Sequence, residues 1–257
     1  MNNIESELYA LTHRGNPGDQ AFYAQSCARA RHVLELGTGY GRLIPSLLSA
    51  TRQTKSEPDR ELWGLDQDKH LLRAAKRKVN ALSPAQRKHV KLVAGDMSDF
   101  AFAQTFDRIV LPYNGLYCLL SRRDILRCFR CVKGHLAPKG EFIFDVWAAD
   151  GFCQHANASE YHDDTGPILT IGHRAQTWDA YEKSRLRSTA QRLDVTYTYV
   201  SREMGTRVTI GIPQRYAPSQ ELVELLGQAG LRVKALYGRF TGSRFGQNSP
   251  FLIVKAA

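Results

Sequence analysis

The sequence lacks long apolar runs and regularly spaced cysteines. No run approaches the roughly 20 apolar residues that a membrane-spanning helix needs. Residues 1–5 also lack the basic and then apolar pattern of a signal peptide. The five cysteines are an odd number without disulfide-like regularity, which is typical of a reducing compartment. We therefore expect a soluble, cytoplasmic protein without a membrane partner.

A metal-binding pattern is also lacking. Cys128 and Cys131 form a CxxC spacing, but they lie between Phe129 and Val132 in a helix-like apolar pattern. A zinc or redox pair would need a second ligand pair or a helix N-terminal position. We interpret the two cysteines as small residues of a helix and expect no metal site.

Acidic residues are fewer than basic ones, and the net charge is +10. Such a charge can indicate nucleic acid or an acidic substrate. The basic residues are scattered among acids, however, with no basic tail and no aromatic-interleaved basic motif. Solvated helix faces account for most of the charge, so a nucleic-acid partner is the less favoured alternative.

Short apolar runs alternate with helical patterns through the first part of the chain, which predicts a doubly wound α/β sheet with parallel strands. The predicted strands are 31–36, 61–65, 90–94, 106–111 and 141–147, and the helices between them include 41–50, 68–80 and 122–134. Two short helices, 4–14 and 19–30, precede the first strand and form an N-terminal helical cap.

The pattern changes after the fifth strand, because the helical period disappears from about 150 to 215. Residues 168–171, 192–200 and 207–212 indicate β-strands, which we interpret as an inserted antiparallel sheet. A helix from Ser219 to Gly230 and strands at 231–240 and 251–254 then complete a seven-stranded sheet. The predicted division is a core of 1–149 with 216–257, and an insertion of 150–215.

A glycine-rich turn follows the first strand, with Gly37, Gly39 and Gly41 directly after Glu35. Glycine lets a backbone take a positive φ or approach a ligand closely. Dinucleotide folds space their glycines as G-x-G-x-x-G to seat a pyrophosphate. The spacing here is G-x-G-x-G, and an acid beside it suits a ligand with an ammonium or sulfonium group.

Polar residues also follow the next strands, namely Asp66, Asp96 and Asn114. In doubly wound sheets, ligands bind outside the carboxyl ends of the strands at the switch point. We therefore expect these side chains and Glu35 to gather at one edge of the sheet.

With these motifs in order, the chain resembles the class I S-adenosylmethionine-dependent methyltransferases over about 31–147 and 216–256. The family's glycine motif, the acid after the second strand and the Gly-Asp after the third match Glu35–Gly41, Asp66 and Gly95-Asp96. The resemblance implies a Rossmann-like methyltransferase fold with an antiparallel last strand, and S-adenosyl-L-methionine as cofactor. The cofactor-binding residues that it implies are Tyr23, Glu35, Gly37, Thr38, Gly39, Asp66, Gln67, Asp96, Met97 and Leu111.

More narrowly, Gly15–Tyr23, Arg215-Tyr216 and Tyr237–Gly242 resemble small-molecule methyltransferases, including those of amino sugars and natural products. Arg239 stands where relatives often have an acid. The resemblance implies that the insertion covers the substrate site and that a small molecule accepts the methyl group on nitrogen or oxygen.

Methyl transfer is an in-line displacement that depends on holding and desolvating the acceptor. A general base is needed only if the acceptor must lose a proton. The favoured catalytic candidates are Tyr113, Tyr117 and His13, followed by Tyr9 and His173 and then by His155 and His162. Asp145 and Asp150 do not have a convincing spacing for a magnesium site.

Two alternatives stay open. An RNA or protein methyltransferase is suggested by the charge and by Leu111–Asn114, which resembles the N/D-P-P-Y/F motif of nucleic-acid amino methyltransferases. The other alternative is a pseudo-enzyme that binds the cofactor as a partner module. The acceptor and a homodimeric state are not readable from the sequence.

Overall fold

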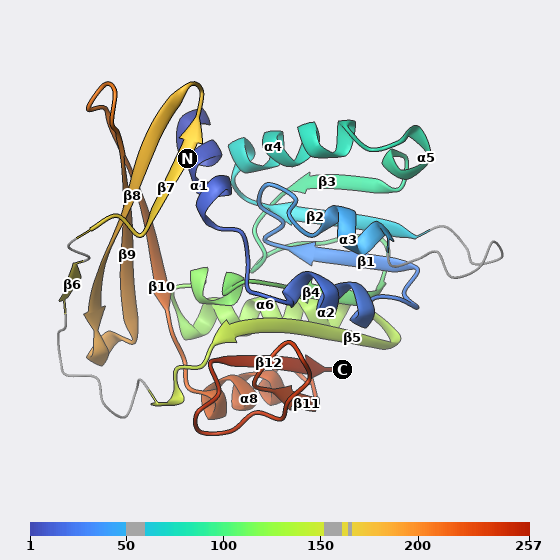
Figure 1. The fold of residues 1–257 in the computed structure, drawn as a ribbon. Coiled ribbons are helices and arrows are strands. Elements are labelled where there is room, and N and C mark those ends of the chain that lie inside the picture. The colour runs from blue at the N-terminus through green and yellow to red at the C-terminus, as the bar shows by residue number, and fades with distance from the viewer. Residues whose placement is uncertain (50–59, 152–160, 164–165) are drawn as a thin grey trace.

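The computed structural model describes residues 1–49, 60–151, 161–163 and 166–257. Its centre is a seven-stranded sheet of order β11-β12-β5-β4-β1-β2-β3 (Figure 1). The first five strands pair in parallel, whereas β12 runs antiparallel to both β5 and β11, as predicted. The strands are β1 (His32–Leu36), β2 (Glu61–Asp66), β3 (Val90–Ala94), β4 (Phe106–Leu111), β5 (Leu136–Trp147), β11 (Val233–Tyr237) and β12 (Phe251–Ala256).

Helices cover both faces of this sheet, because its strands are apolar on both sides. On β1, Val33 packs with α2 (Asp19–Ser26), α3 (Ile44–Ser49) and α4 (Lys69–Asn80). The next residue, Leu34, belongs to the opposite core with α6 (Arg122–His135) and α8 (Ser219–Gln228). The doubly wound architecture is therefore confirmed. The remaining helical elements are α1 (Asn3–Thr12), α5 (Pro84–Arg87), η1 (Gly115–Cys118) and η2 (Ser188–Ala190).

A second, antiparallel sheet follows β5 and confirms the predicted insertion of β structure. Its order is β10-β9-β8-β6, and β7 also pairs with β8. In Figure 1 it stands beside the ends toward which β1, β3 and β5 point, with α1 against its inner face. Leu8 of α1 packs there with Trp178, Tyr199 and Ile210. The strands are β6 (Tyr161–Asp163), β7 (Leu169–His173), β8 (Gln176–Arg187), β9 (Arg192–Ser201) and β10 (Arg207–Arg215).

Sequence reasoning missed β8, which pairs with three other strands. Most of its outward positions are charged, and Glu182 and Ser184 interrupt the inward apolar alternation of Trp178, Ala180 and Leu186. A half-exposed antiparallel sheet accepts such charges on its open face. The short strand β6 was also missed, because three residues carry no periodicity.

Some element boundaries also differ from the predicted ones. The helix expected from Gly41 begins only at Ile44, because Gly41 has φ +73° and cannot join a right-handed helix. The strand expected over 231–240 is limited to Val233–Tyr237. The polar composition of residues 51–60 predicts a loop, and this stretch lies outside the described residues except for Arg60.

Cys128 and Cys131 both lie within α6 as free thiols, as predicted. Burial raises the pKa of the Cys128 thiol, which keeps it protonated. Among the residues that the structure describes, no helix combines the length and the apolar composition needed to cross a membrane.

We predict that Phe129→Ala lowers the free energy of unfolding by about 3–5 kcal/mol. Phe129 is fully buried in α6, and its ring lies 5.8 Å from the ring centroids of both Phe142 and Phe144 on β5. Val223→Ala on the exposed side of α8 should change the free energy by less than about 0.5 kcal/mol. Denaturant unfolding measures both free energies. An equally small decrease for Phe129→Ala and Val223→Ala would contradict the burial of Phe129 in this core.

Candidate active site

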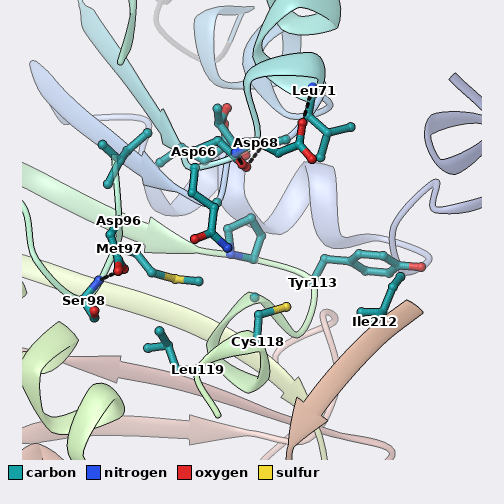
Figure 2. Close-up of a pocket in the computed structure, with 18 of the residues that line it drawn as sticks. Asp66, Asp68, Leu71, Asp96, Met97, Ser98, Tyr113, Cys118, Leu119 and Ile212 are labelled. Atoms are coloured by element: carbon teal, nitrogen blue, oxygen red, sulfur yellow. Dashed lines mark hydrogen bonds between the residues drawn. The ribbon is translucent and has the colours of Figure 1, made fainter. Parts of the chain in front are cut away.

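A cavity of about 580 Å³ lies where β1 to β4 end and where β10 faces the central sheet. Its size falls in the range of about 300–1,000 Å³ that is common for small-ligand sites. Figure 2 shows Asp96, Met97 and Ser98 on one side of this cavity, with Tyr113 and Ile212 on the other. The central sheet and the second sheet therefore both contribute to one site.

Most of the predicted cofactor-binding residues line this cavity. They are Glu35, Gly37, Thr38, Gly39, Asp66, Gln67, Asp96 and Met97. Of the predicted catalytic residues, His13 and Tyr113 line it, as does the lesser candidate Tyr9. The carboxyl ends of parallel strands thus bring together residues that are up to about a hundred positions apart in the chain.

The glycine turn after β1 is held by backbone hydrogen bonds. The Thr38 amide donates to the Leu65 carbonyl at 3.0 Å, and the Gly41 amide donates to the Thr38 carbonyl at 2.9 Å. Gly37 and Gly39 have φ values of +64° and +54°. A Cβ added at Gly39 would meet nothing nearer than 3.9 Å, so this backbone is open toward the cavity. The turn is a cradle that a ligand can approach closely.

Asp66 connects this turn to the end of β2. Its carboxylate accepts hydrogen bonds from the Gly39 amide at 2.7 Å and the Asp68 amide at 2.8 Å. The cap of α4 is Asp68, whose carboxylate accepts from the amides of His70 and Leu71. Asp66 is therefore not the cap of that helix, and its carboxylate borders the cavity (Figure 2).

Asp96 lies in the turn after β3. Its Oδ1 accepts from the Ser98 amide at 2.7 Å, which fixes the carboxylate against its own turn. Met97 and Ser98 line the cavity beside it (Figure 2). This end of the site therefore offers a carboxylate and a thioether side chain to a flat ligand group.

Glu35 is the buried acid of the site, and its Oε2 accepts a hydrogen bond from the Thr38 hydroxyl at 2.8 Å. Burial raises the pKa of Glu35 to about 7, against the lowering effects of Thr38 and Arg42. Burial likewise raises the pKa of Asp66. Two carboxylates that resist ionisation in one cavity favour a ligand that carries positive charge.

The wall nearest the second sheet is aromatic. The His13 ring stacks on Tyr9 at 3.9 Å and lies edge-on to Tyr113 at 6.4 Å. Burial lowers the pKa of His13 to about 4, so the ring is neutral at physiological pH. Its Nδ1 lies 2.9 Å from the Thr12 hydroxyl and 3.1 Å from the Tyr9 carbonyl. With the proton on Nδ1, donated to that carbonyl, Nε2 is free to accept a hydrogen bond.

The structure does not bring Tyr117, Tyr23 and Leu111 into the cavity, although the sequence predicted roles for them there. All three are fully buried. The Tyr117 hydroxyl donates to the Trp147 and Ala217 carbonyls at 3.1 and 3.0 Å, which joins two segments of the core. The Tyr117 hydroxyl is thus occupied by two backbone carbonyls of the core and does not border the cavity.

Tyr23 acts on the site through Asp145. The Tyr23 hydroxyl donates to Asp145 Oδ1 at 2.6 Å, and the same oxygen accepts from the Tyr113 amide at 2.9 Å. Tyr113 and Asn114 both have positive φ, at 55° and 59°, which costs energy for residues other than glycine. The buried carboxylate thus holds the strained turn that presents Tyr113.

The remaining candidates lie elsewhere. His173, at the end of β7, donates through Nε2 to Glu7 Oε2 of α1 at 2.9 Å, and it does not line the cavity. His155 lies outside the described residues, and only the backbone of His162, in β6, is described. The Asp150 carboxylate accepts from the amide and hydroxyl of Ser219, so it serves the start of α8. Arg239 is exposed and does not line the cavity.

Sequence reasoning missed two parts of the wall. The first is Arg42, which directly follows the glycine turn and lines the cavity. Its guanidinium forms a bidentate ion pair with Asp19, at 2.7 and 2.9 Å, and lies 5.5 Å from the centre of the Tyr113 ring. Gly211, Ile212 and Pro213 of β10 close the opposite side. Because Arg42 directly follows the glycine motif, the sequence could have indicated that it lines the site. Nothing in the sequence marks Gly211, Ile212 and Pro213 as site residues.

A central sheet of this order, with a glycine turn and acids after its first three strands, defines a nucleoside-cofactor methyltransferase. The donor set fits such a cofactor, because the cavity offers carboxylates and a glycine cradle, and the helix end that borders it, the start of α4, is capped by the acid Asp68. Residues 33–140 match the family model described as a methyltransferase domain.

Known proteins agree with this class. The Bacillus subtilis (strain 168) protein YqeM, provisionally named a methyltransferase, is 24% identical over 225 residues, covering 87% of this chain and 83% of that protein. The CcbJ methyltransferase from Streptomyces caelestis is 24% identical with a TM-score of 0.77, covering 94% of this chain and 90% of that chain. CalS10 is an amino pentose methyltransferase of Micromonospora echinaspora whose structure was solved with S-adenosylmethionine. It is 17% identical with a TM-score of 0.67, and the match covers 99% of this chain and 97% of that chain.

These matches confirm the predicted resemblance to the S-adenosylmethionine-dependent methyltransferases. The protein is an enzyme of this class, and S-adenosylmethionine is the cofactor of the class.

We predict that Gly39→Ala weakens S-adenosylmethionine binding at least tenfold, because the added methyl group points into the cavity. Gly205→Ala is the matched control, since Gly205 also has positive φ, +65°, and open space around an added Cβ. Both variants should lose about 1–2 kcal/mol of stability through backbone strain. Calorimetric titration separates them, and equal affinities would argue against ligand contact at Gly39.

We also predict that S-adenosylmethionine affinity rises with pH through the pKa of Glu35, about 7. Below that pH the carboxyl is protonated and no longer attracts a cation, so affinity falls by up to about tenfold per pH unit. Glu35→Gln should bind more weakly at alkaline pH and lose this dependence. Titrations across this pH range measure it, and an unchanged profile in the variant would assign the titration to another group.

Proposed function

We propose that this methyltransferase transfers a methyl group to a small molecule, with nitrogen favoured over oxygen as the acceptor atom. The observation that carries the proposal is the cavity in which acids at the strand ends and the aromatic wall of Tyr9, His13 and Tyr113 lie together with residues of β10. A covered, partly aromatic cavity suits a small acceptor better than a polymer.

For the cofactor, the proposal assigns one chemical group of S-adenosylmethionine to each of three acids in the cavity. Glu35 would lie near the positive end, and Asp66 would accept the ribose hydroxyls as a bidentate acceptor. Asp96 would accept from the adenine amino group, with the backbone of Met97 beside it. Two observations support this orientation of the cofactor. They are the open backbone at Gly37 and Gly39 and the raised pKa values of Glu35 and Asp66.

When bound, S-adenosylmethionine supplies an electrophilic methyl carbon on a sulfonium group that leaves as a neutral thioether. The work of the chain is then to hold an acceptor in line and to exclude water. His13 Nε2 can accept a hydrogen bond from the acceptor and so orient its lone pair. The rings of Tyr9 and Tyr113 exclude water around it.

Nitrogen is favoured because His13, the imidazole of the aromatic wall, is a weak base. The pKa of His13 is about 4, so this ring is a poor base for removing a hydroxyl proton. A neutral amine needs no deprotonation before attack, since its lone pair is the nucleophile. CalS10, the amino pentose enzyme among the similar structures, agrees with this preference.

The RNA or protein alternative draws on the net charge of +10. Arg127 lines the cavity, but it pairs with Asp99 at 3.1 Å. A partner module without turnover would bind the cofactor and methylate nothing.

Within the favoured proposal, residues 1–149 with 216–257 form the core, and 150–215 cover the acceptor. A cytoplasmic location rests on the cysteine pattern, and a homodimer stays open.

We predict that the protein moves the labelled methyl group of S-adenosylmethionine to small molecules in a fractionated metabolite extract. Small primary and secondary amines should be methylated faster than hydroxyl compounds of the same size. Purified RNA and denatured protein extract serve as the competing acceptor classes in the same assay. Labelling of RNA or protein alone would contradict the proposal, and cofactor binding without any labelling would favour the partner module.

A further inference from the structure

The inner face of the second sheet carries a carboxylate close to the aromatic wall. Trp178 and Ala180 of β8 are buried on this face, and Glu182 is the next residue in the same alternation. Its direct cross-strand partner on β9 is Tyr197. Glu182 therefore lies on the inner face of the second sheet, the face that packs on α1, and it lies behind the residues that line the cavity.

Aromatic rings connect Glu182 to the cavity. Tyr197 lies directly opposite Glu182 on the neighbouring strand, and burial together with the Glu182 charge raises the pKa of Tyr197. The Tyr197 ring lies edge-on to His13 at 4.7 Å, and His13 borders Tyr113 in the cavity. The charge of Glu182 also acts on Tyr113, where it contributes to a raised pKa. The carboxylate is thus within electrostatic reach of the aromatic wall.

Among the residues that the structure describes, Glu182 differs from its neighbours in having no cationic partner. Asp179, on the outer face of the same strand, pairs with Arg202 at 2.8 Å. Asp194 on β9 pairs with Arg187 at 3.2 Å and Arg192 at 3.1 Å. In the described part of the chain no Lys, Arg or His forms an ion pair with Glu182. In a chain of net charge +10, a half-buried carboxylate without a counter-ion is unusual.

We propose that Glu182, with Tyr197 and Tyr113, forms the subsite that binds a positively charged amino group of the acceptor, and that Glu182 selects cationic over neutral acceptors. A carboxylate beside aromatic rings attracts an ammonium group through charge and through the ring faces. The inference rests on the proposed function, since it names the charge of the small-molecule acceptor. It concerns binding of the acceptor, whichever nitrogen receives the methyl group.

The test compares wild type, Glu182→Gln, Glu182→Asp and the control Asp179→Asn. Each protein is assayed with labelled S-adenosylmethionine on size-matched pairs of aliphatic or sugar diamines and amino alcohols, so that one amino group can bind as a cation while another nitrogen accepts the methyl group. For amines, Glu182→Gln should raise KM about tenfold or more, while kcat and cofactor affinity change little. Glu182→Asp keeps the charge and should recover part of the affinity, which also guards against misfolding of the Gln variant. Asp179→Asn should match wild type.

The outcomes separate this proposal from the function on which it rests. Methylation of alcohols alone, or an amine KM unchanged in Glu182→Gln, would overturn the role of Glu182 and leave a small-molecule methyltransferase standing. Failure of wild type to methylate any small molecule would overturn both. A loss of cofactor affinity in Glu182→Gln equal to its loss of amine affinity would also overturn the subsite, because the effect would then be structural.

Discussion

The hydrogen bond between the Gly39 amide and the Asp66 carboxylate is the interaction on which the cofactor site depends. It connects the turn after β1 to the end of β2, and the Thr38 amide strengthens this connection by donating to Leu65. The turn requires a positive φ at Gly37 and Gly39, so it forms only where glycine removes the steric cost. Because neighbouring parallel strands end together, the same contact sets Glu35 and Asp96 around one cavity.

A second buried carboxylate organises the acceptor side. Asp145 is fully buried, and burial raises its pKa to about 6, because removing a carboxylate from water costs free energy. Hydrogen bonds from two separate segments, donated by the Tyr23 hydroxyl and the Tyr113 amide, offset this desolvation cost. Its position explains how a strained turn can present Tyr113 at the cavity. The N-terminal segment is fixed at the same wall by the pair of Asp19 and Arg42.

The cofactor half of the site was predictable from sequence because its signals are local. Glu35, Asp66 and Asp96 each follow an apolar strand, and strand ends converge in any doubly wound sheet. The acceptor half was less predictable, because it depends on tertiary contacts. Nothing in the sequence distinguishes Tyr113, which borders the cavity, from Tyr117, whose hydroxyl is bound to two carbonyls of the core. The strand that carries Glu182 was missed for a related reason, since an inward charge breaks the alternation that identifies a strand.

The central claim is that acids at the strand ends bind S-adenosylmethionine through its ribose and its positive end. Calorimetric titration of the wild type and Asp66→Ala with S-adenosylmethionine tests it most directly. The account predicts one site per chain in the wild type and a loss of about 1.5–3 kcal/mol of binding free energy in the variant. Absence of binding to the wild type, or equal affinity in a folded Asp66→Ala variant, would contradict it.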